Sequence, residues 1–439
     1  MGSYIALTDQ DKREMLSEIG LSHMESLYSD VPEAVRNKAT LHLKNGQSEM
    51  ETEREIRALA ARNHVFSTCL RGAGAYRHYI PAIVDEVASK EDFLTAYTPY
   101  QAEVSQGVLQ SIFEYQTMIC ELTGLNVSNA SLYDGASAAA EAVAMCRERG
   151  RMTALVCSGV NPDTVSTIKT YAHGANAQVV MVPARDGLAD TEALESLLTR
   201  DVACFVVQQP NFYGIFEDVR ALFSLARKNN IKCVEIVNPI ALGVMETPAD
   251  SGAHIAVGEG QPLGLPMAFG GPYLGFMACE AALMRKLPGR IVGETTDKDG
   301  NRAFVLTLQA REQHIRREKA LSNVCSNEAL CALRASVYLA AVGADGLKQA
   351  AVLCMSKAHY LADGLKKLGL QCMYPQPFFH EFLTACPVQP EKLLNALAKH
   401  DILGGLPVQG GILWCVTEMV TKEEMDKAVA IVGEVLSCG

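Results

Sequence analysis

The sequence has few of the features that mark membrane, secreted, zinc-binding or nucleic-acid-binding proteins. It shows no apolar run near the roughly 20 residues that a membrane span needs. Its 14 cysteines are scattered, without a C-x-x-C pair or a zinc-ligand spacing, so we expect free thiols in a reducing compartment. The formal net charge of −11 argues against nucleic acid or an anionic membrane as the main partner. We therefore expect a globular cytoplasmic protein that binds neither.

Lysine is missing from a long stretch in the middle of the chain, since none occurs between Lys232 and Lys286. Within that stretch, residues 258–272 have the glycine- and proline-rich layout of the loop that carries the catalytic lysine in pyridoxal-phosphate (PLP) enzymes. Such enzymes hold the cofactor as an imine on a lysine amine, and the amide of glutamine cannot form one. The sequence therefore predicts a PLP-type fold that lacks the central catalytic group.

Two further motifs are missing. The segment 72–77 lacks the third glycine of the dinucleotide fingerprint and does not follow a clear strand, which excludes NAD binding there. No Ser/His/Asp or Cys/His arrangement has a recognisable local signature. Hydride transfer and serine or cysteine nucleophilic catalysis are therefore not indicated.

From Asp134 onward, short apolar segments alternate with amphipathic ones. The pattern predicts strands at 153–157, 178–182, 202–208 and 232–237, and helices at 136–149, 163–172, 191–199 and 219–228. Alternating strands and helices predict a mostly parallel sheet that is covered on both faces. Residues 266–278 predict a hairpin-like segment with a Gly-Gly-Pro turn.

The chain divides into three predicted parts: a helical arm at 1–63, a large α/β domain at 64–330 and a small C-terminal α+β domain at 331–439. The last part is predicted to hold long helices at 328–342 and 348–368, strands at 382–385 and 412–416, and a final helix at 422–436.

Several residues lie where a cofactor would bind in such a fold. Ser137 follows a small-residue turn at a predicted helix N-terminus, which can bind phosphate or can simply pack helix on strand. Phe212 follows a strand end and could cover a cofactor ring, or belong to an ordinary aromatic loop. Asn238 stands where PLP enzymes usually place an aspartate that pairs with the pyridine nitrogen.

Two polar loops and one charged segment are candidates for a pocket or an interface. The loop 95–107 and the cluster formed by Arg71 and residues 76–79 are dense in hydrogen-bonding side chains. Residues 311–319 have mixed charge, which favours a solvated face or a subunit contact and leaves open an anion-binding arginine.

Long motifs along nearly the whole chain carry a resemblance to one family. They are Gly74–Pro81, Tyr97–Gly107, Glu114–Thr117, Asn129–Gly135, Phe269–Gly275, Arg311–Ala320 and Cys415–Glu418. In this order they resemble the P-protein family of the glycine cleavage system, glycine dehydrogenase (decarboxylating), in particular the N-terminal-half subunit of its two-subunit form.

The resemblance implies a fold-type I PLP architecture, like that of aspartate aminotransferase, in an α2β2 complex. It implies that subunit 2 carries PLP on a lysine, and it sets Gln261 of this chain in that lysine's place. The implied reaction decarboxylates glycine on PLP, releases CO2 and transfers the aminomethyl group to the lipoyl arm of H-protein. No nicotinamide takes part in this step, in agreement with the missing fingerprint.

Sites of this fold lie at subunit interfaces, so the resemblance also suggests residues that reach the partner's active site. Tyr97 and Tyr100 are the first candidates, and Tyr115, Arg71 and His78 come second. The cofactor-binding residues left in this chain would be vestigial: Ser137, Phe212, Asn238 and Gln261. The sequence departs from the family pattern at Leu321, where we expect a small hydroxyl residue, and at Asn238, where we expect an acid.

Two other interpretations share these observations. The chain could be an autonomous PLP enzyme that uses a displaced lysine such as Lys286, which lies on a predicted helix beyond the hairpin. It could also be a scaffold subunit without a part in chemistry. Activity of the isolated chain would favour the first, and turnover insensitive to substitution of Tyr97 or Tyr100 would favour the second.

Overall fold

The computed structural model describes residues 6–38 and 46–437, which fall into two compact units, Met1–Val65 and Phe66–Gly439. The first unit contains helices α1 (Asp9–Glu18), α2 (Glu33–Arg36) and α3 (Glu49–Ala60) and the 3-10 turn η1 (Met24–Tyr28). Thr8 and Ser48 begin α1 and α3 with capping boxes, which satisfy two of the free N–H groups at each helix start. Parts of the predicted arm, at 1–5 and 39–45, lie outside the described residues.

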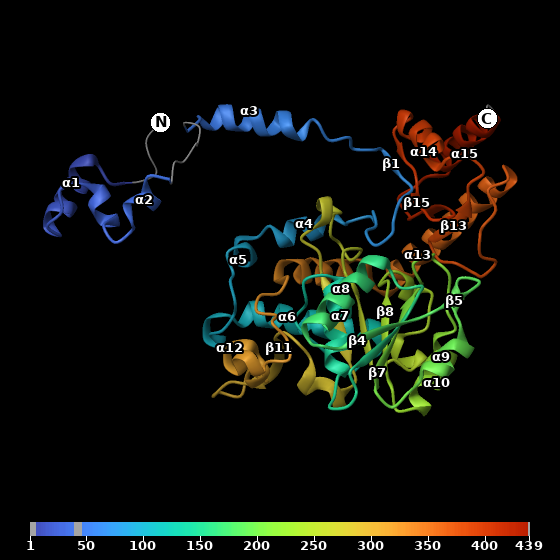
Figure 1. Cartoon of the computed structure of the whole chain (residues 1–439), viewed down its shortest axis with the longest axis horizontal. Helices are drawn as coiled ribbons and strands as arrows, with labels where there is room; N and C mark the ends of the chain where they lie inside the picture. The colour runs from blue at the N-terminus through green and yellow to red at the C-terminus, as the bar shows by residue number, and fades with distance from the viewer. Residues whose placement is uncertain (1–5, 39–45, 438–439) are drawn as a thin grey trace. The chain divides into compact units, whose positions relative to one another are not determined.

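The second unit is built around a seven-stranded sheet of order β2-β10-β9-β8-β7-β3-β4 (Figure 1). Its strands are β2 (Val127–Ser128), β3 (Thr153–Cys157), β4 (Gln178–Val182), β7 (Val202–Gln209), β8 (Lys232–Val237), β9 (Ile255–Glu259) and β10 (Gly275–Cys279). The strands from β9 to β4 are parallel, and β10 runs antiparallel to both β9 and β2. The prediction of a mostly parallel sheet is confirmed.

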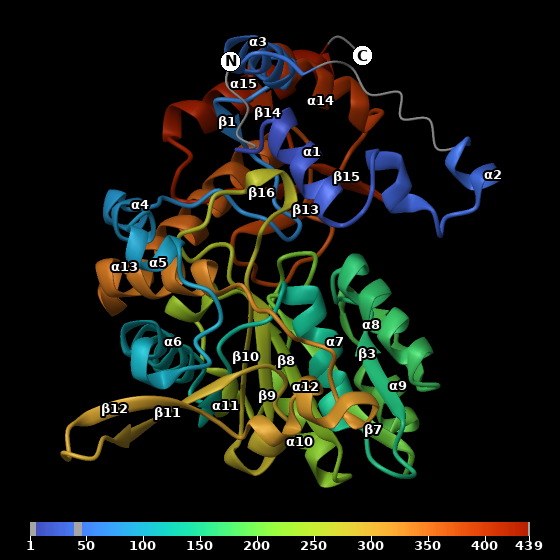
Figure 2. The same cartoon turned by 90° about the vertical axis from the view of Figure 1, so that its left-hand side faces the viewer.

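Helices cover both faces of this sheet. Consecutive strand residues point to opposite faces, so apolar residues along a strand contribute to two separate hydrophobic cores. On β9, Ile255 and Val257 belong to one hydrophobic core and Ala256 to the other. The first core contains residues of α7 (Gly135–Cys146), α8 (Pro162–Gly174), α9 (Thr191–Leu197) and α10 (Val219–Lys228), and the second of α4 (Ala82–Ala88), α6 (Gln106–Thr123) and α13 (Ala329–Lys367). Figure 2 shows α7 and α8 on one side of the sheet and α6 and α13 on the other.

Helix α13 joins the second core to a smaller, third core. It consists of two helices joined at a kink where Gly343 has φ 62°, which agrees with the two helices predicted at 328–342 and 348–368. The third core contains residues from the end of α13 and from β13 (Glu381–Ala385), β16 (Gly411–Cys415), α14 (Pro390–Lys399) and α15 (Lys422–Ser437). A third strand, β15 (Leu406–Val408), pairs with β16 at the edge of this three-stranded sheet.

By length and composition, α13 is the one helix of the described residues that could cross a membrane. Its buried side chains lie in two hydrophobic cores of the protein, which accounts for its apolar composition. The predicted domain boundary near residue 330 falls at the start of α13, and the division of 64–439 into two domains stays a prediction.

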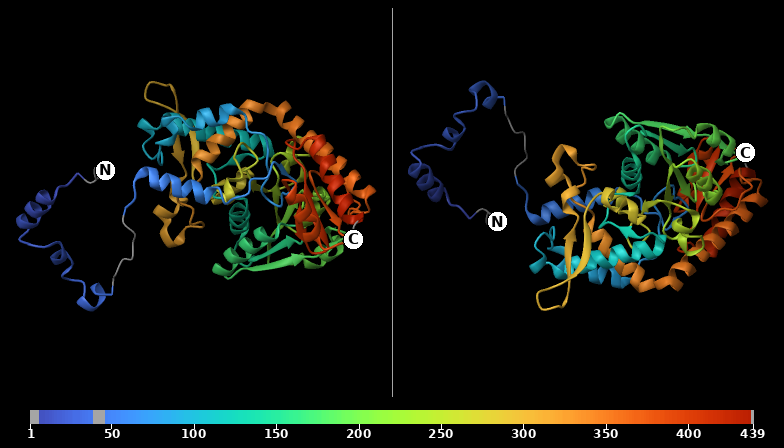
Figure 3. Two further views of the ribbon diagram at one scale, coloured as in Figure 1. Left: turned by 90° about the horizontal axis from the view of Figure 1, so that it is seen from above. Right: turned by 90° about the horizontal axis from the view of Figure 1, so that it is seen from below.

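Two regions differ from the expected elements. The segment 266–278 is not itself a hairpin: the antiparallel pair is β9 with β10, and the intervening loop contains only the 3-10 turn η4 (Ala268–Gly270). A hairpin of β11 (Ile291–Thr296) and β12 (Arg302–Thr307), absent from the sequence prediction, projects from the body (Figures 2 and 3). Its turn is closed by Asp297, whose carboxylate accepts the N–H groups of Asp299 and Asn301.

Candidate cofactor pocket

A cavity of about 390 Å³ lies at the carboxyl ends of the parallel strands, the edge at which open α/β sheets bind ligands. Gln208, Asn238 and Glu259 enter its wall from the ends of β7, β8 and β9. The start of α7, the segment Gly72–Tyr76 and the β13 side complete the wall. Of the predicted cofactor residues, Phe212 and Asn238 line this cavity, whereas Ser137 and Gln261 are not among its described lining residues.

Gln261 is buried, with 1% of its surface exposed, and its side-chain amide is hydrogen-bonded to the backbone. Its Nε2 donates to the carbonyl oxygens of Tyr76 (2.9 Å) and Leu265 (2.8 Å), and its Oε1 accepts the N–H of Tyr76 at 2.8 Å. The amide thus ties its own loop to the segment Gly72–Tyr76. A lysine could not replace the bond from the Tyr76 N–H, because its ammonium group donates but cannot accept.

The carboxylate of Glu259 holds the start of α7 to the end of β9. Oε2 accepts the N–H of Gly135 at 2.9 Å, and Oε1 accepts the N–H groups of Gln261 (2.9 Å) and Leu274 (3.0 Å). Burial raises the pKa of this carboxyl to about 7, against the opposing effect of the three N–H donors. Glu259 was not predicted as a site residue, because its contact with Gly135 spans 124 positions of sequence.

The start of α7 is closed to anions by two acidic side chains. The carboxylate of Asp134 accepts the N–H of Ser137 at 2.7 Å, and the Ser137 hydroxyl donates back to the Asp134 carbonyl oxygen at 3.0 Å. Glu259 takes the N–H of Gly135, as described above. A helix N-terminus attracts phosphate through its free N–H groups and its positive dipole end. Here carboxylates already occupy that position.

Asn238 puts a neutral amide in the cavity wall, at the position where a pyridinium would need an acid. The Asn238 Oδ1 accepts the N–H groups of Ile240 (2.9 Å) and Ala241 (3.3 Å), so this side chain closes the turn after β8. Its Nδ2 lies 3.4 Å from His380 Nε2. Burial lowers the pKa of His380 well below its usual value, so the imidazole is neutral.

The residues of this cavity therefore do not fit PLP. Among its described lining residues there is no lysine to form an imine and no arginine or lysine to hold a phosphate. Carboxylates stand at the helix start, where the phosphate would need N–H donors, and a neutral amide stands where the ring nitrogen would need an acid. The cavity lies where this kind of fold binds its ligand, but its described lining residues lack the groups that PLP requires.

A second carboxyl, also missed by the sequence interpretation, joins the segment Gly72–Tyr76 to β13. Glu381 accepts the N–H of Ala73 at Oε1 (2.6 Å) and the hydroxyl of Tyr76 at Oε2 (2.8 Å). Its pKa is raised to about 7 by burial, which outweighs these two donors. The segment that covers the pocket is thus held from both sides, by Gln261 and by Glu381.

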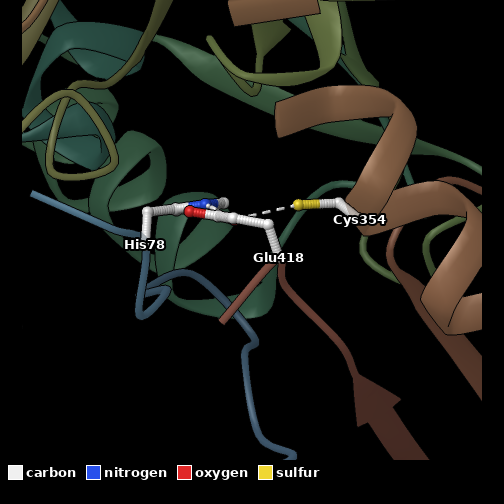
Figure 4. Close-up of side chains that lie close together, drawn as sticks. All are labelled: His78, Cys354 and Glu418. Carbon is white, nitrogen blue, oxygen red and sulfur yellow. Dashed lines mark hydrogen bonds and ion pairs between the residues drawn. The ribbon is translucent and has the colours of Figure 1, made fainter. Parts of the chain in front are cut away.

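His78 lies in a closed cluster with Glu418 and Cys354 (Figure 4). Glu418 Oε2 is hydrogen-bonded to His78 Nδ1 at 2.7 Å and accepts the thiol of Cys354 at 3.2 Å. Burial opposes ionisation of Glu418, but the hydrogen bond and charge of His78 lower its pKa to about 2. Burial and Glu418 raise the pKa of Cys354, so its thiol stays protonated and donates. One carboxylate oxygen already takes both donors, which makes the cluster a structural unit.

The other predicted contributors to a partner's site lie in different environments. Tyr97 is 84% exposed and Tyr100 is 52% exposed, both on the loop after α5 (Glu91–Leu94). Tyr115 is 1% exposed and packs in the second core, so its ring contacts only this chain. Arg71 is partly buried and donates to the carbonyl oxygens of Gly404 and Gly405, which ties it to the segment before β15.

Comparison with known proteins decides the family. A model of the glycine cleavage system P-protein matches residues 2–432 of this chain. The chain belongs to this family. Its relatives include the "probable glycine dehydrogenase (decarboxylating) subunit 1" of Carboxydothermus hydrogenoformans, 49% identical with 98% of this chain and 99% of the relative covered. The protein of the same name from Desulfitobacterium hafniense is 46% identical, with 99% and 100% covered. Within the P-protein family, the chain thus falls in the subunit 1 branch.

Solved structures agree. A glycine decarboxylase (P-protein) of the glycine cleavage system, in inhibitor-bound form, is 41% identical with a TM-score of 0.92, over 99% of this chain and 100% of that one. More distant similarity to a NifS-like protein (TM-score 0.64, 14% identity, 85% of this chain and 100% of that chain) shows the fold alone. The fold is that of PLP-dependent fold-type I enzymes, as predicted.

Proposed function

We propose that this P-protein chain is the subunit without cofactor in an α2β2 glycine decarboxylase of the cytoplasm. Subunit 2 carries PLP on its lysine, and together the subunits decarboxylate glycine, release CO2 and transfer the aminomethyl group to the lipoyl arm of H-protein. The observation that supports this division of labour is that Glu259, in the pocket wall, and Gln261, in the loop beside it, bind backbone groups of this chain.

In this proposal the chain contributes a rigid fold and a surface that contacts subunit 2. Glu381 and Gln261 hold the segment Gly72–Tyr76 in place through hydrogen bonds to its backbone and to the Tyr76 hydroxyl. The loop with Tyr97 and Tyr100 presents its aromatic side chains to the outside. Val104 (79% exposed) and Phe269 (92% exposed) are further large apolar side chains left at the surface, and exposed apolar groups of this size favour a protein interface.

We assign Tyr97 and Tyr100 to the active site of subunit 2, with Tyr97 the stronger candidate because its ring is the more exposed. Arg71 and His78 act indirectly, since Arg71 Nε donates to the carbonyl oxygen of Gly404 and His78 Nδ1 is hydrogen-bonded to Glu418. Tyr115 is left out because its side chain is buried in the core. A scaffold role without any such contact is the second candidate, favoured by the closed pocket alone.

The test is glycine–bicarbonate exchange with PLP and lipoylated H-protein, measured for this chain alone, for subunit 2 alone and for the mixture. We expect exchange only in the mixture, and an imine absorbance only from subunit 2. Exchange by this chain alone would overturn the proposal, and borohydride trapping with peptide mapping would then show whether Lys286 or another amine holds the cofactor.

A further inference from the structure

Arg290 is a buried cation without a counter-charge in the described part of the chain. Only 4% of the residue is exposed, and its guanidinium makes no ion pair with a described carboxylate. Nη1 donates to Asn327 Oδ1 at 3.0 Å, Nη2 has only long contacts to Thr98 Oγ1 (3.5 Å) and Tyr100 Oη (3.4 Å), and Nε has no hydrogen-bond partner.

Such an arrangement is unusual for a residue with a purely structural role. Burying a charge is unfavourable unless a counter-charge or a full set of hydrogen bonds compensates it. The Nε of Arg311, a less buried arginine, also lacks a partner, but its two Nη groups donate to the carbonyl oxygens of Leu287 and Gly289, and it lies beside the charge of Glu312. Arg290 has neutral acceptors only, which leaves it deficient in negative charge.

Arg290 lies beside the loop that we propose contacts subunit 2. Arg290 directly precedes β11, and its guanidinium carbon lies 5.5 Å from the centre of the Tyr100 ring. Thr98 and Tyr100 belong to the loop whose neighbour Tyr97 is 84% exposed. An anion that approaches this loop from outside would meet the guanidinium beside Thr98 and Tyr100.

We infer that Arg290 completes an oxyanion site, taking a carboxylate or a phosphate monoester that subunit 2 presents across the interface. The inference rests on the proposed assembly. A planar guanidinium suits both ligands because its N–H groups can donate in pairs to two oxygens. The carboxylate of glycine is a poor candidate, since a cation bound to it would stabilise the substrate relative to the transition state in which that charge is lost.

Arg290→Gln in the assembled protein tests the site. The matched control is Arg302→Gln, which removes an exposed arginine of the same hairpin that has its own carboxylate partner, Glu294. For the isolated chain we expect the Tm of Arg290→Gln to be unchanged or raised, because an uncompensated charge is removed. In the complex we expect at least about a tenfold loss of affinity for subunit 2 or for its cofactor, because a buried anion loses its partner. The control should change neither.

The two sources of the oxyanion give different patterns. A carboxylate side chain of subunit 2 predicts an equal loss of subunit affinity with and without PLP. A cofactor phosphate predicts unchanged assembly without PLP and faster PLP loss from the complex. A lower Tm or failure to fold of the isolated Arg290→Gln chain would show a structural arginine and overturn the inference, as would unchanged affinity for both subunit and cofactor. If the wild-type subunits do not assemble at all, the proposed function itself fails.

Discussion

The carboxylate of Glu259 accepts the backbone N–H of Gly135 at 2.9 Å, joining the last residue of β9 to the first residue of α7. This contact puts a side-chain carboxylate where the helix start would otherwise offer its N–H to a phosphate. The two residues lie 124 positions apart in the sequence. The pocket of this subunit is closed to an anion from within the chain.

Gly135 permits this approach because it has no side chain. A Cβ at this position would lie 2.8 Å from the backbone nitrogen of Glu259 and 2.9 Å from its Cβ, closer than such atoms can approach. We expect Gly135→Ala to lower the free energy of unfolding by about 1–3 kcal/mol, because strand and helix must separate. Urea denaturation of the isolated chain measures it.

The control is Gly174→Ala at the end of α8, where an added Cβ would meet nothing within 4 Å. That substitution should leave stability unchanged or raise it by up to ~1 kcal/mol, through reduced freedom of the unfolded chain. Equal losses for both glycines would show that the contact with Glu259 is not the cause.

Restoring the missing amine alone should not restore cofactor binding. In Gln261→Lys, the new side chain would replace an amide that binds Tyr76 and Leu265, while Glu259 and Asp134 stay at the helix start. We expect no borohydride-stable adduct at residue 261 after incubation with PLP. Gln261→Met, which has no amine, is the control for nonspecific labelling of other lysines. A stoichiometric adduct mapped to position 261 would contradict the account of the closed pocket.

The sequence predicts the main sheet well because its strands are short apolar runs with clear helices between them. The expected bounds of β3, β4 and β8 agree with the structure. It fails at β9, where the glycines of Gly258-Glu259-Gly260 resemble a loop, and at the β11–β12 hairpin, whose turn was not recognised.

The site is less predictable than the fold for a physical reason. The absence of lysine can be read directly, since one residue type at one place decides whether an imine can form. The role of Glu259 cannot, because its partners Gly135 and Leu274 come from separate elements that only the folded sheet brings together. Tyr115 shows the same limit: the resemblance made it a second candidate for reaching the partner's site, but its ring is 1% exposed and packs in the second core.

The His78–Glu418 pair should make stability depend on acid. The pKa of Glu418 is lowered from 4.5 to about 2 by His78, despite the opposing effect of burial. A carboxyl with a depressed pKa in the folded state contributes stability above its unfolded pKa and loses that contribution as pH falls toward its folded pKa. The shift corresponds to at most ~3 kcal/mol, lost between about pH 5 and pH 2.

Glu418→Gln should therefore lower stability at pH 6 and show a smaller further loss between pH 5 and pH 2 than the wild type. Urea denaturation at several pH values measures both. Glu192→Gln, at a carboxylate whose side chain is 82% exposed, is the control and should follow the wild-type curve. Parallel curves for wild type and Glu418→Gln would mean that this pair does not set the acid dependence.

Substitution of Tyr97 distinguishes a subunit that takes part in catalysis from one that acts only as a scaffold. Its ring is 84% exposed in this chain, so its removal costs the isolated subunit almost nothing. If the ring contacts the active site of subunit 2, Tyr97→Ala should lower kcat/KM for glycine–bicarbonate exchange by roughly tenfold or more, the loss of about 1.4 kcal/mol of transition-state stabilisation. Assembly, measured by sedimentation, should be preserved. Tyr171→Ala, at a tyrosine on α8 that is 37% exposed, should leave both quantities unchanged. Full turnover of an intact Tyr97→Ala complex would favour the scaffold, because the most exposed aromatic ring of the loop would then have no part in the reaction.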